Sequence, residues 1–121
     1  MASSGLTGEE LSRYDRQVRV LGVEGQLRLK RGSVLVVGAG GLGSAALYYL
    51  AAAGVGGVVV VDPGRVDLSD LNRQVLYTTG DVGRLKAYVA RERLVVLNPN
   101  VKVEAYARPL DEERAEELVP G

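Results

Sequence analysis

The chain has 121 residues, the length of one domain, and its 46% hydrophobic and 25% charged residues are typical of a globular protein. Its formal net charge is zero, so no long-range field draws it to nucleic acid or to an anionic membrane. The absence of cysteine and histidine excludes disulfides, a thiolate nucleophile, cysteine zinc sites and a histidine general base.

Residues 1–32 are predicted to form an N-terminal helical segment. Thr7 and Glu10 have the spacing of a capping box, in which each side chain accepts a hydrogen bond from the other residue's backbone N–H. This pattern begins a helix over residues 8–20, and Gly22 stands where that helix would stop. A second, short amphipathic helix is expected over residues 24–30.

The chain is organised around residues 34–43, VLVVGAGGLG. Residues 34–37 lack polar alternation, which predicts a strand buried on both faces of a parallel sheet. Gly38, Gly40 and Gly43 have G-x-G-x-x-G spacing, and a helix over residues 44–53 follows them. Glycines allow a tight turn, and the free N–H groups that begin a helix attract an anion. A nucleotide phosphate is therefore the expected occupant.

A second apolar strand, residues 57–61, runs directly into Asp62. Asp62 lies about 20 residues beyond Gly43, the usual place of a carboxylate that binds ribose hydroxyls. Strand, glycine loop, helix and acid together predict a nucleotide site, although at this point they leave open both the base and the chemistry. The connection over residues 63–83 is long, but apolar residues recur along it, which predicts an ordered loop.

A further helix is predicted over residues 84–97, with one face packed on the sheet. The residues expected on that face are Lys86, Ala87, Ala90, Leu94 and Leu97. A half-exposed strand over residues 101–107 and a short charged helix over residues 111–118 follow.

This order predicts an α/β fold, the N-terminal β-α-β-α-β half of a Rossmann-like, doubly wound parallel sheet with preceding helices. We expect residues 1–121 to form a single nucleotide-binding domain, with residues 1–32 helical and residues 33–121 forming the Rossmann-like half. The last strand would then be an uncovered edge. We therefore expect the domain to be incomplete, either a fragment or a chain completed by a partner.

Several motifs together resemble the ThiF/MoeB adenylyltransferases, a family similar to the adenylation domain of ubiquitin-activating enzymes. They are LSDLNRQ at residues 68–74, RYDRQ at residues 13–17 and G-x-x-K ending at Lys86. The resemblance extends from about Leu11 to Asn100 and includes Gln26, GVG at residues 54–56 and LNP at residues 97–99. It implies an enzyme that uses ATP to adenylate the C-terminal glycine of a small ubiquitin-like or sulfur-carrier protein.

The resemblance also assigns roles to residues. The glycine loop would hold the ATP phosphates, and Asp62 would bind the ribose. Arg73 and Lys86 would contact the phosphates as catalytic cations, while Arg16 would reach the ATP of the partner subunit in a homodimer. The complete expected ATP-binding set is Gly38, Gly40, Gly41, Leu42, Gly43, Asp62, Ser69, Asp70, Asn72, Arg73 and Lys86. Fixed cations aimed at the α-phosphate make such a site chemically sufficient without histidine or cysteine.

Two positions depart from the family pattern. Asp62-Pro-Gly64 lacks the second acid of the usual D-x-D, and Asp70 stands where the family usually has asparagine. A carboxylate beside a triphosphate is unfavourable unless a cation lies between them. The family's metal-binding aspartate lies on a later strand, so we expect ATP and Mg²⁺ as cofactors but no metal ligand within this chain.

Other interpretations remain open. The glycine loop and Asp62 also fit an NAD- or FAD-binding domain of a redox or sensing protein, and a non-catalytic interaction module would keep the same fold. Arg13 and Arg16 taken alone would indicate a solvated helix face. No apolar stretch has the length of a bilayer span and no signal peptide begins the chain, so we expect a cytoplasmic protein without membrane or nucleic-acid partners.

Overall fold

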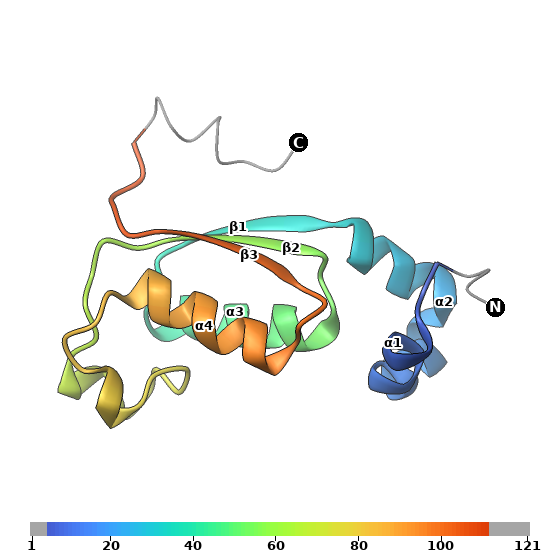
Figure 1. Cartoon of the computed structure of the whole chain (residues 1–121), viewed down its shortest axis with the longest axis horizontal. Helices are drawn as coiled ribbons and strands as arrows, with labels where there is room; N and C mark the ends of the chain where they lie inside the picture. The colour runs from blue at the N-terminus through green and yellow to red at the C-terminus, as the bar shows by residue number, and fades with distance from the viewer. Residues whose placement is uncertain (1–4, 112–121) are drawn as a thin grey trace.

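The computed structural model describes residues 5–111. Two N-terminal helices precede a parallel, three-stranded sheet with the order β1-β2-β3 (Figure 1). In chain order the helices and strands are α1 (Gly8–Arg13), α2 (Asp15–Arg31), β1 (Ser33–Val37), α3 (Gly41–Ala53), β2 (Gly57–Val61), α4 (Lys86–Leu97) and β3 (Lys102–Tyr106). The predicted α/β fold with a parallel β-α-β-α-β unit is confirmed.

β2 is the central strand of the sheet. Its first residue, Gly57, is in register with Ser33 of β1 and with Lys102 of β3. Residues 58–61 are buried, as the apolar run predicted. The prediction that the first strand is buried on both faces is wrong: β1 is half-buried, and Val37 is 57% exposed. Within residues 5–111, β1 has a neighbouring strand on one side only.

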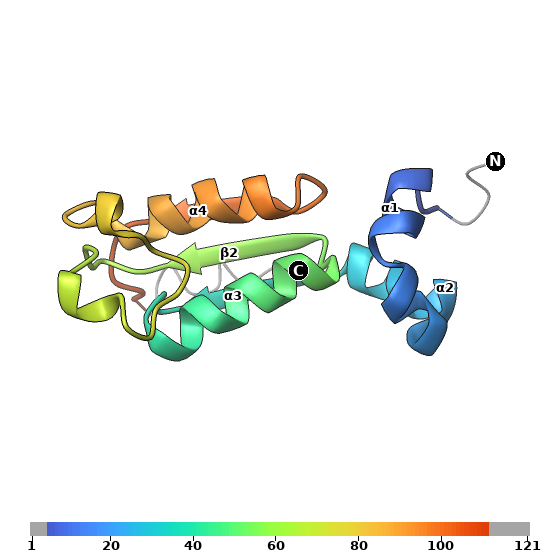
Figure 2. The same cartoon turned by 90° about the horizontal axis from the view of Figure 1, so that it is seen from below.

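Helices α3 and α4 cover the same face of the sheet (Figures 1 and 2). Right-handed crossovers place them there because each successive strand is added on the same side of the one before it. The main core lies in this layer and includes Leu47, Val58, Val60, Val89 and Leu94. A smaller apolar cluster on the opposite face is centred on β2 and consists of Val59, Val61, Leu35, Tyr106 and Leu110.

The crossover helices begin at different residues than predicted. α3 starts at Gly41 rather than at residue 44, because the last glycines of the loop already have helical geometry. α4 starts at Lys86 rather than at residue 84, because Leu85 is an extended N-cap residue. Its predicted sheet-facing side is confirmed, since Ala87, Ala90 and Leu94 are fully buried. Strand β3 is shorter than predicted, Lys102–Tyr106 rather than residues 101–107.

The N-terminal helices lie at the end of the sheet where the strands begin (Figure 1). The predicted capping box is confirmed: the Thr7 N–H donates to Glu10 Oε1 at 3.0 Å, and the Glu10 N–H donates to Thr7 Oγ1 at 3.1 Å. The single helix expected over residues 8–20 is interrupted at Tyr14, which separates α1 from α2. Gly22 has φ +75° and breaks α2 where a stop was predicted.

Buried polar groups attach these helices to the rest of the fold. Asn98 Nδ2 donates to the Tyr14 hydroxyl and to the Ala51 carbonyl, both at 2.7 Å. Gln17 Nε2 and Gln26 Nε2 donate to the Ala53 carbonyl at 2.6 and 2.9 Å. The end of α3 therefore anchors α2, and Asn98 connects the junction of α1 and α2 to α3.

The long connection between β2 and α4 is ordered, as predicted. It contains two short 3₁₀ helices, Leu68–Asp70 and Thr79–Asp81. The buried Asp81 carboxylate fixes the second of them to α4, because Arg93 Nη2 donates to both of its oxygens at 2.8 Å. Most of the helix predicted over residues 111–118 lies outside the described residues. Between residues 5 and 111, no helix combines the length and apolar character needed to cross a bilayer.

Candidate functional site

The glycine loop connects the end of β1 to the first turn of α3. Gly38 has φ +90°, and a Cβ on Gly43 would lie 1.7 Å from the Gly38 carbonyl oxygen. Any side chain at these two positions would therefore disrupt the turn. Gly40 is the N-cap of α3, and no described side chain caps this end of the helix. The N–H groups of the first turn are thus left for an anion.

Asp62 follows β2 and is bonded to the glycine loop. Its Oδ2 accepts a hydrogen bond from the Ala39 backbone N–H at 2.7 Å, and its Oδ1 accepts one from the Gly64 N–H at 2.6 Å. The side chain is almost completely buried. Because a carboxylate has about four acceptor positions, Asp62 retains the capacity to accept hydrogen bonds from ligand hydroxyls.

Lys86 lies beside the turn that Asp62 stabilises. Its backbone N–H donates to the Gly64 carbonyl at 3.0 Å, and its Cδ lies 3.9 Å from the position that a Cβ on Gly64 would occupy. The ammonium nitrogen is 3.2 Å from Asp70 Oδ2. The exposed fractions of these two side chains are 13% and 12%, so the ion pair is largely removed from water.

Asp70 is held by its own 3₁₀ turn as well as by cations. Its Oδ2 accepts the Asp67 backbone N–H at 2.9 Å, and its Oδ1 lies 3.9 Å from Arg73 Nη2. The Asp67 hydrogen bond stabilises the ionised carboxylate, burial opposes ionisation, and Lys86 and Arg73 favour it. The net result is that the pKa of Asp70 lies below its usual value.

Arg73 is on the exposed side of the site. Its Nη1 donates to the Ser69 carbonyl at 3.0 Å and to Asn72 Oδ1 at 3.1 Å. The side chain is 59% exposed, so it can turn toward a ligand without breaking buried contacts. Ser69 and Asn72 are themselves exposed, and in the described structure they support Arg73.

Arg16 is not brought to this site. It belongs to the first turn of α2, at the end of the sheet where the strands begin, whereas the glycine loop follows the opposite end of β1 (Figure 1). Its side chain is exposed and forms no ion pair with another residue between 5 and 111. The other predicted residues lie on the glycine loop, the β2 turn, the following 3₁₀ turn and the start of α4.

Two further residues contribute to the site and were not predicted. The buried Tyr77 hydroxyl donates to the Ala39 carbonyl at 2.6 Å, and burial, followed by nearby carboxylates, raises its pKa. Gln74 is buried with its Nε2 3.7 Å from the Cβ position of Gly40, and its Oε1 has no hydrogen-bond partner among residues 5–111. Gln74 could have been found because it ends the 68–74 motif, whereas nothing in the sequence distinguishes Tyr77 from a packing residue.

This arrangement suits a phosphorylated ligand that also carries hydroxyl groups. Backbone N–H groups and two cations are available to the phosphate, and Asp62 is available to the hydroxyls. A cluster of three or more His, Cys, Asp or Glu side chains that could bind a metal ion does not occur within residues 5–111. The site therefore offers positively charged side chains to an anionic ligand.

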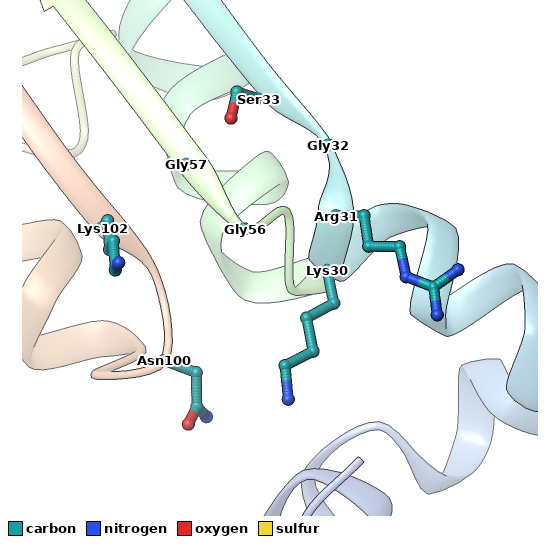
Figure 3. A pocket seen from close by; sticks show the side chains of 8 residues that line it. All are labelled: Lys30, Arg31, Gly32, Ser33, Gly56, Gly57, Asn100 and Lys102. Atoms are coloured by element: carbon teal, nitrogen blue, oxygen red, sulfur yellow. The ribbon is translucent and has the colours of Figure 1, made fainter. Parts of the chain in front are cut away.

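A separate cavity of about 290 Å³ lies where the strands begin (Figure 3). It is lined by Lys30, Arg31, Gly32, Ser33, Gly56, Gly57, Asn100 and Lys102. The Lys30 ammonium pairs with Glu10 at 2.8 Å, and Figure 3 shows the Arg31 side chain directed away from Gly56 and Gly57. The lysine and arginine side chains that line this cavity do not point toward a common centre, and none of the predicted site residues lines it.

Comparisons with known proteins agree with this geometry. The model of the ThiF family matches residues 14–121. The chain is 60% identical over 115 residues to a sulfur carrier protein adenylyltransferase of Thermus thermophilus, covering 93% of this chain and 42% of that protein. It is 48% identical over 118 residues to MoeZ, a probable adenylyltransferase/sulfurtransferase of Mycobacterium tuberculosis, covering 96% of this chain and 30% of that protein.

The fold is also similar to that of a solved enzyme. The crystal structure of the E. coli tRNA N6-threonylcarbamoyladenosine dehydratase TcdA in complex with ATP matches with a TM-score of 0.86 at 27% identity. The match covers 92% of this chain and 46% of that one. The chain thus spans less than half the length of each of these three proteins.

Proposed function

Because the chain belongs to the ThiF family, we propose that it is the ATP-binding front half of an adenylyltransferase. The proposed reaction is adenylation of the C-terminal glycine of a small ubiquitin-like or sulfur-carrier protein. The name of the Thermus relative and the ATP complex of TcdA support this proposal. We further propose a cytoplasmic location and no nucleic-acid or membrane partner.

The observation that carries the proposal is the placement of Lys86 beside Asp62 and the glycine loop. Asp62 would offer its carboxylate to the ribose, and Lys86 and Arg73 would offer their positive charges to the phosphates. In adenylation the carrier's carboxylate oxygen attacks the α-phosphorus, and the bond from that phosphorus to the bridging oxygen of pyrophosphate breaks. Lys86 and Arg73 would stabilise the negative charge that develops on the phosphate oxygens. The N–H groups of the glycine loop would orient the chain of phosphates.

Mg²⁺ is the cofactor that ATP chemistry of this kind requires. The described residues do not fit a protein-held Mg²⁺, because they provide no cluster of acidic ligands. Of the two carboxylates at the site, Asp62 already accepts two backbone N–H groups and Asp70 is paired with Lys86. We therefore propose that Mg²⁺ would arrive bound to the phosphates of ATP.

Arg16 fits the proposal only if a second copy of the chain supplies it. It is exposed, and it stands at the opposite end of the sheet from the glycine loop (Figure 1). We propose a homodimer in which Arg16 of one copy reaches the phosphates bound to the other. Light scattering at tens of micromolar protein, a range suited to ordinary subunit affinities, tests this arrangement. A strictly monomeric chain would rule it out.

Titration calorimetry tests the proposed nucleotide. ATP and NAD are compared in the presence of magnesium, and tighter binding of NAD would overturn the proposal in favour of a dinucleotide-binding domain. Arg73→Ala should weaken ATP binding about tenfold or more, since a hydrogen bond to a charged group contributes about 1.5–3 kcal/mol. AMP binding should change less. Arg91→Ala is the matched control, because Arg91 is an exposed arginine that stacks on Tyr88 at 5.3 Å.

A further inference from the structure

Asp70 is a carboxylate placed among groups proposed to bind phosphate. Its side chain is 12% exposed, and its carboxylate lies 3.2 Å from the Lys86 ammonium and 3.9 Å from the Arg73 guanidinium. Within residues 5–111 it is the only ion-pair partner of either cation. Before any nucleotide arrives, Lys86 and Arg73 are therefore already facing an anion.

The position of Asp70 does not depend on the cations alone. Its Oδ2 accepts the Asp67 N–H, so the carboxylate is held by the backbone of its own turn. The backbone of Lys86 is also fixed, because its N–H donates a hydrogen bond to the Gly64 carbonyl and because Lys86 is the first residue of α4. The pair therefore has a defined geometry, and a largely buried ammonium is costly without a partner.

We infer that Asp70 is a positioning residue that holds Lys86 in place in the nucleotide-free protein and competes with the nucleotide's phosphates for it. This inference rests on the proposed function, because it requires that the phosphates bind at Lys86. A triphosphate approaching Lys86 also approaches Asp70, and two like charges a few ångströms apart repel in a site with little water. The repulsion is greater for ATP than for AMP, which carries fewer charges. Asp70 thus lowers the affinity for ATP while it stabilises the empty site.

The test is Asp70→Asn, which keeps the size of the side chain and the oxygen that accepts the Asp67 N–H but removes the charge. Asp67→Asn is the matched control. It removes a charge from the same turn, but the Asp67 carboxylate is bonded to the N–H and hydroxyl of Ser69 rather than to Lys86. Asp70→Glu restores the charge. Each protein is the full chain, titrated with ATP and with AMP by calorimetry and melted without nucleotide.

The expected result for Asp70→Asn is ATP binding about fivefold to tenfold tighter than wild type, the order of one partly screened charge pair. AMP should bind less than about threefold tighter, and the nucleotide-free variant should melt at a lower temperature because Lys86 has lost its partner. Asp67→Asn should bind ATP within about twofold of wild type, and Asp70→Glu, which keeps the charge, should bind ATP less tightly than Asp70→Asn. Should Asp70→Asn not fold, Asp70→Ser provides an uncharged acceptor with the same expectation.

Different failures have different meanings. If wild type binds ATP but Asp70→Asn binds it no more tightly, or melts no lower without nucleotide, the inference is overturned and the proposed function stands. Weaker ATP binding by Asp70→Asn in magnesium but not in EDTA would identify Asp70 as a metal ligand and would also overturn it. If neither protein binds ATP, the proposed function fails and the inference fails with it.

Discussion

Gly54 is the residue at which a single added methyl group should most directly test how the N-terminal helices are attached. It ends α3 with φ +92°, and a Cβ there would lie 2.5 Å from Tyr14 Cζ and 2.8 Å from Gln26 Nε2. Gly54→Ala therefore combines two costs. An L residue in the left-handed region costs about 1–2 kcal/mol. The clash must also displace Tyr14, whose hydroxyl is bonded to Asn98.

Gly83 allows these two costs to be separated. It has φ +90°, but nothing lies within 4 Å of the Cβ position, so Gly83→Ala carries only the backbone cost. The clash at Gly54 should add about 1–3 kcal/mol of overpacking and about 1 kcal/mol for the lost hydrogen bond. We expect Gly54→Ala to lower the free energy of unfolding by about 3–6 kcal/mol and Gly83→Ala by about 1–2 kcal/mol. At this chain length the melting temperatures should fall by about 4 °C for each kcal/mol.

Both variants are also made in a Tyr14→Ala background. Thermal unfolding then measures the clash directly, as the difference between the cost of Gly54→Ala with and without the Tyr14 ring. Without the Tyr14 ring, the cost of Gly54→Ala should fall toward that of Gly83→Ala, because the two closest contacts of the methyl group are gone and only the flexible amide end of Gln26 remains, at 2.8 Å. An unchanged cost in the Tyr14→Ala background would show that the ring does not limit this position, and the reasoning would be refuted.

Three other variants test the remaining parts of the site. Asp81→Asn should cost about 3 kcal/mol at pH 7 by leaving Arg93 unpaired. Although burial opposes ionisation, hydrogen bonds from Thr78 and the charge of Arg93 hold the pKa of Asp81 below its ordinary 3.8. The stabilisation by the ionised Asp81 is therefore complete above about pH 4 and should disappear as the pH falls further, which urea unfolding at several pH values would measure. Tyr77→Phe removes the hydrogen bond to the Ala39 carbonyl and should cost about 1 kcal/mol, with weaker ATP binding by calorimetry; an unchanged affinity would mean that the loop does not depend on this bond. Leu42 is 92% exposed, so Leu42→Ala should change stability by less than about 0.5 kcal/mol, and if it leaves ATP affinity unchanged as well, Leu42 is not part of the site.

The local features of this fold could be predicted from sequence because neighbouring residues alone produce them. The capping box at Thr7 and the break at Gly22 each depend on residues within one or two turns. The buried strand before Asp62 was evident from its uninterrupted run of valines, and a parallel sheet followed from the alternation of strands and helices. Most of the candidate site could be located because the glycine loop and Asp62 are fixed by the same local pattern.

The tertiary structure decided the features that depend on residues far apart in the chain. The burial of β1 depends on which elements cover it, so its apolar sequence gave the wrong expectation. Tyr14 and Asn98 are 84 residues apart, and Tyr77 and Ala39 are 38 apart, so neither hydrogen bond could be inferred from a local pattern. The pairing of Asp70 with Lys86 likewise requires the long loop to bring its 3₁₀ turn to the start of α4. A sequence pattern records the type of each side chain, whereas a charge or hydroxyl acquires its partner only when the fold brings distant segments into contact.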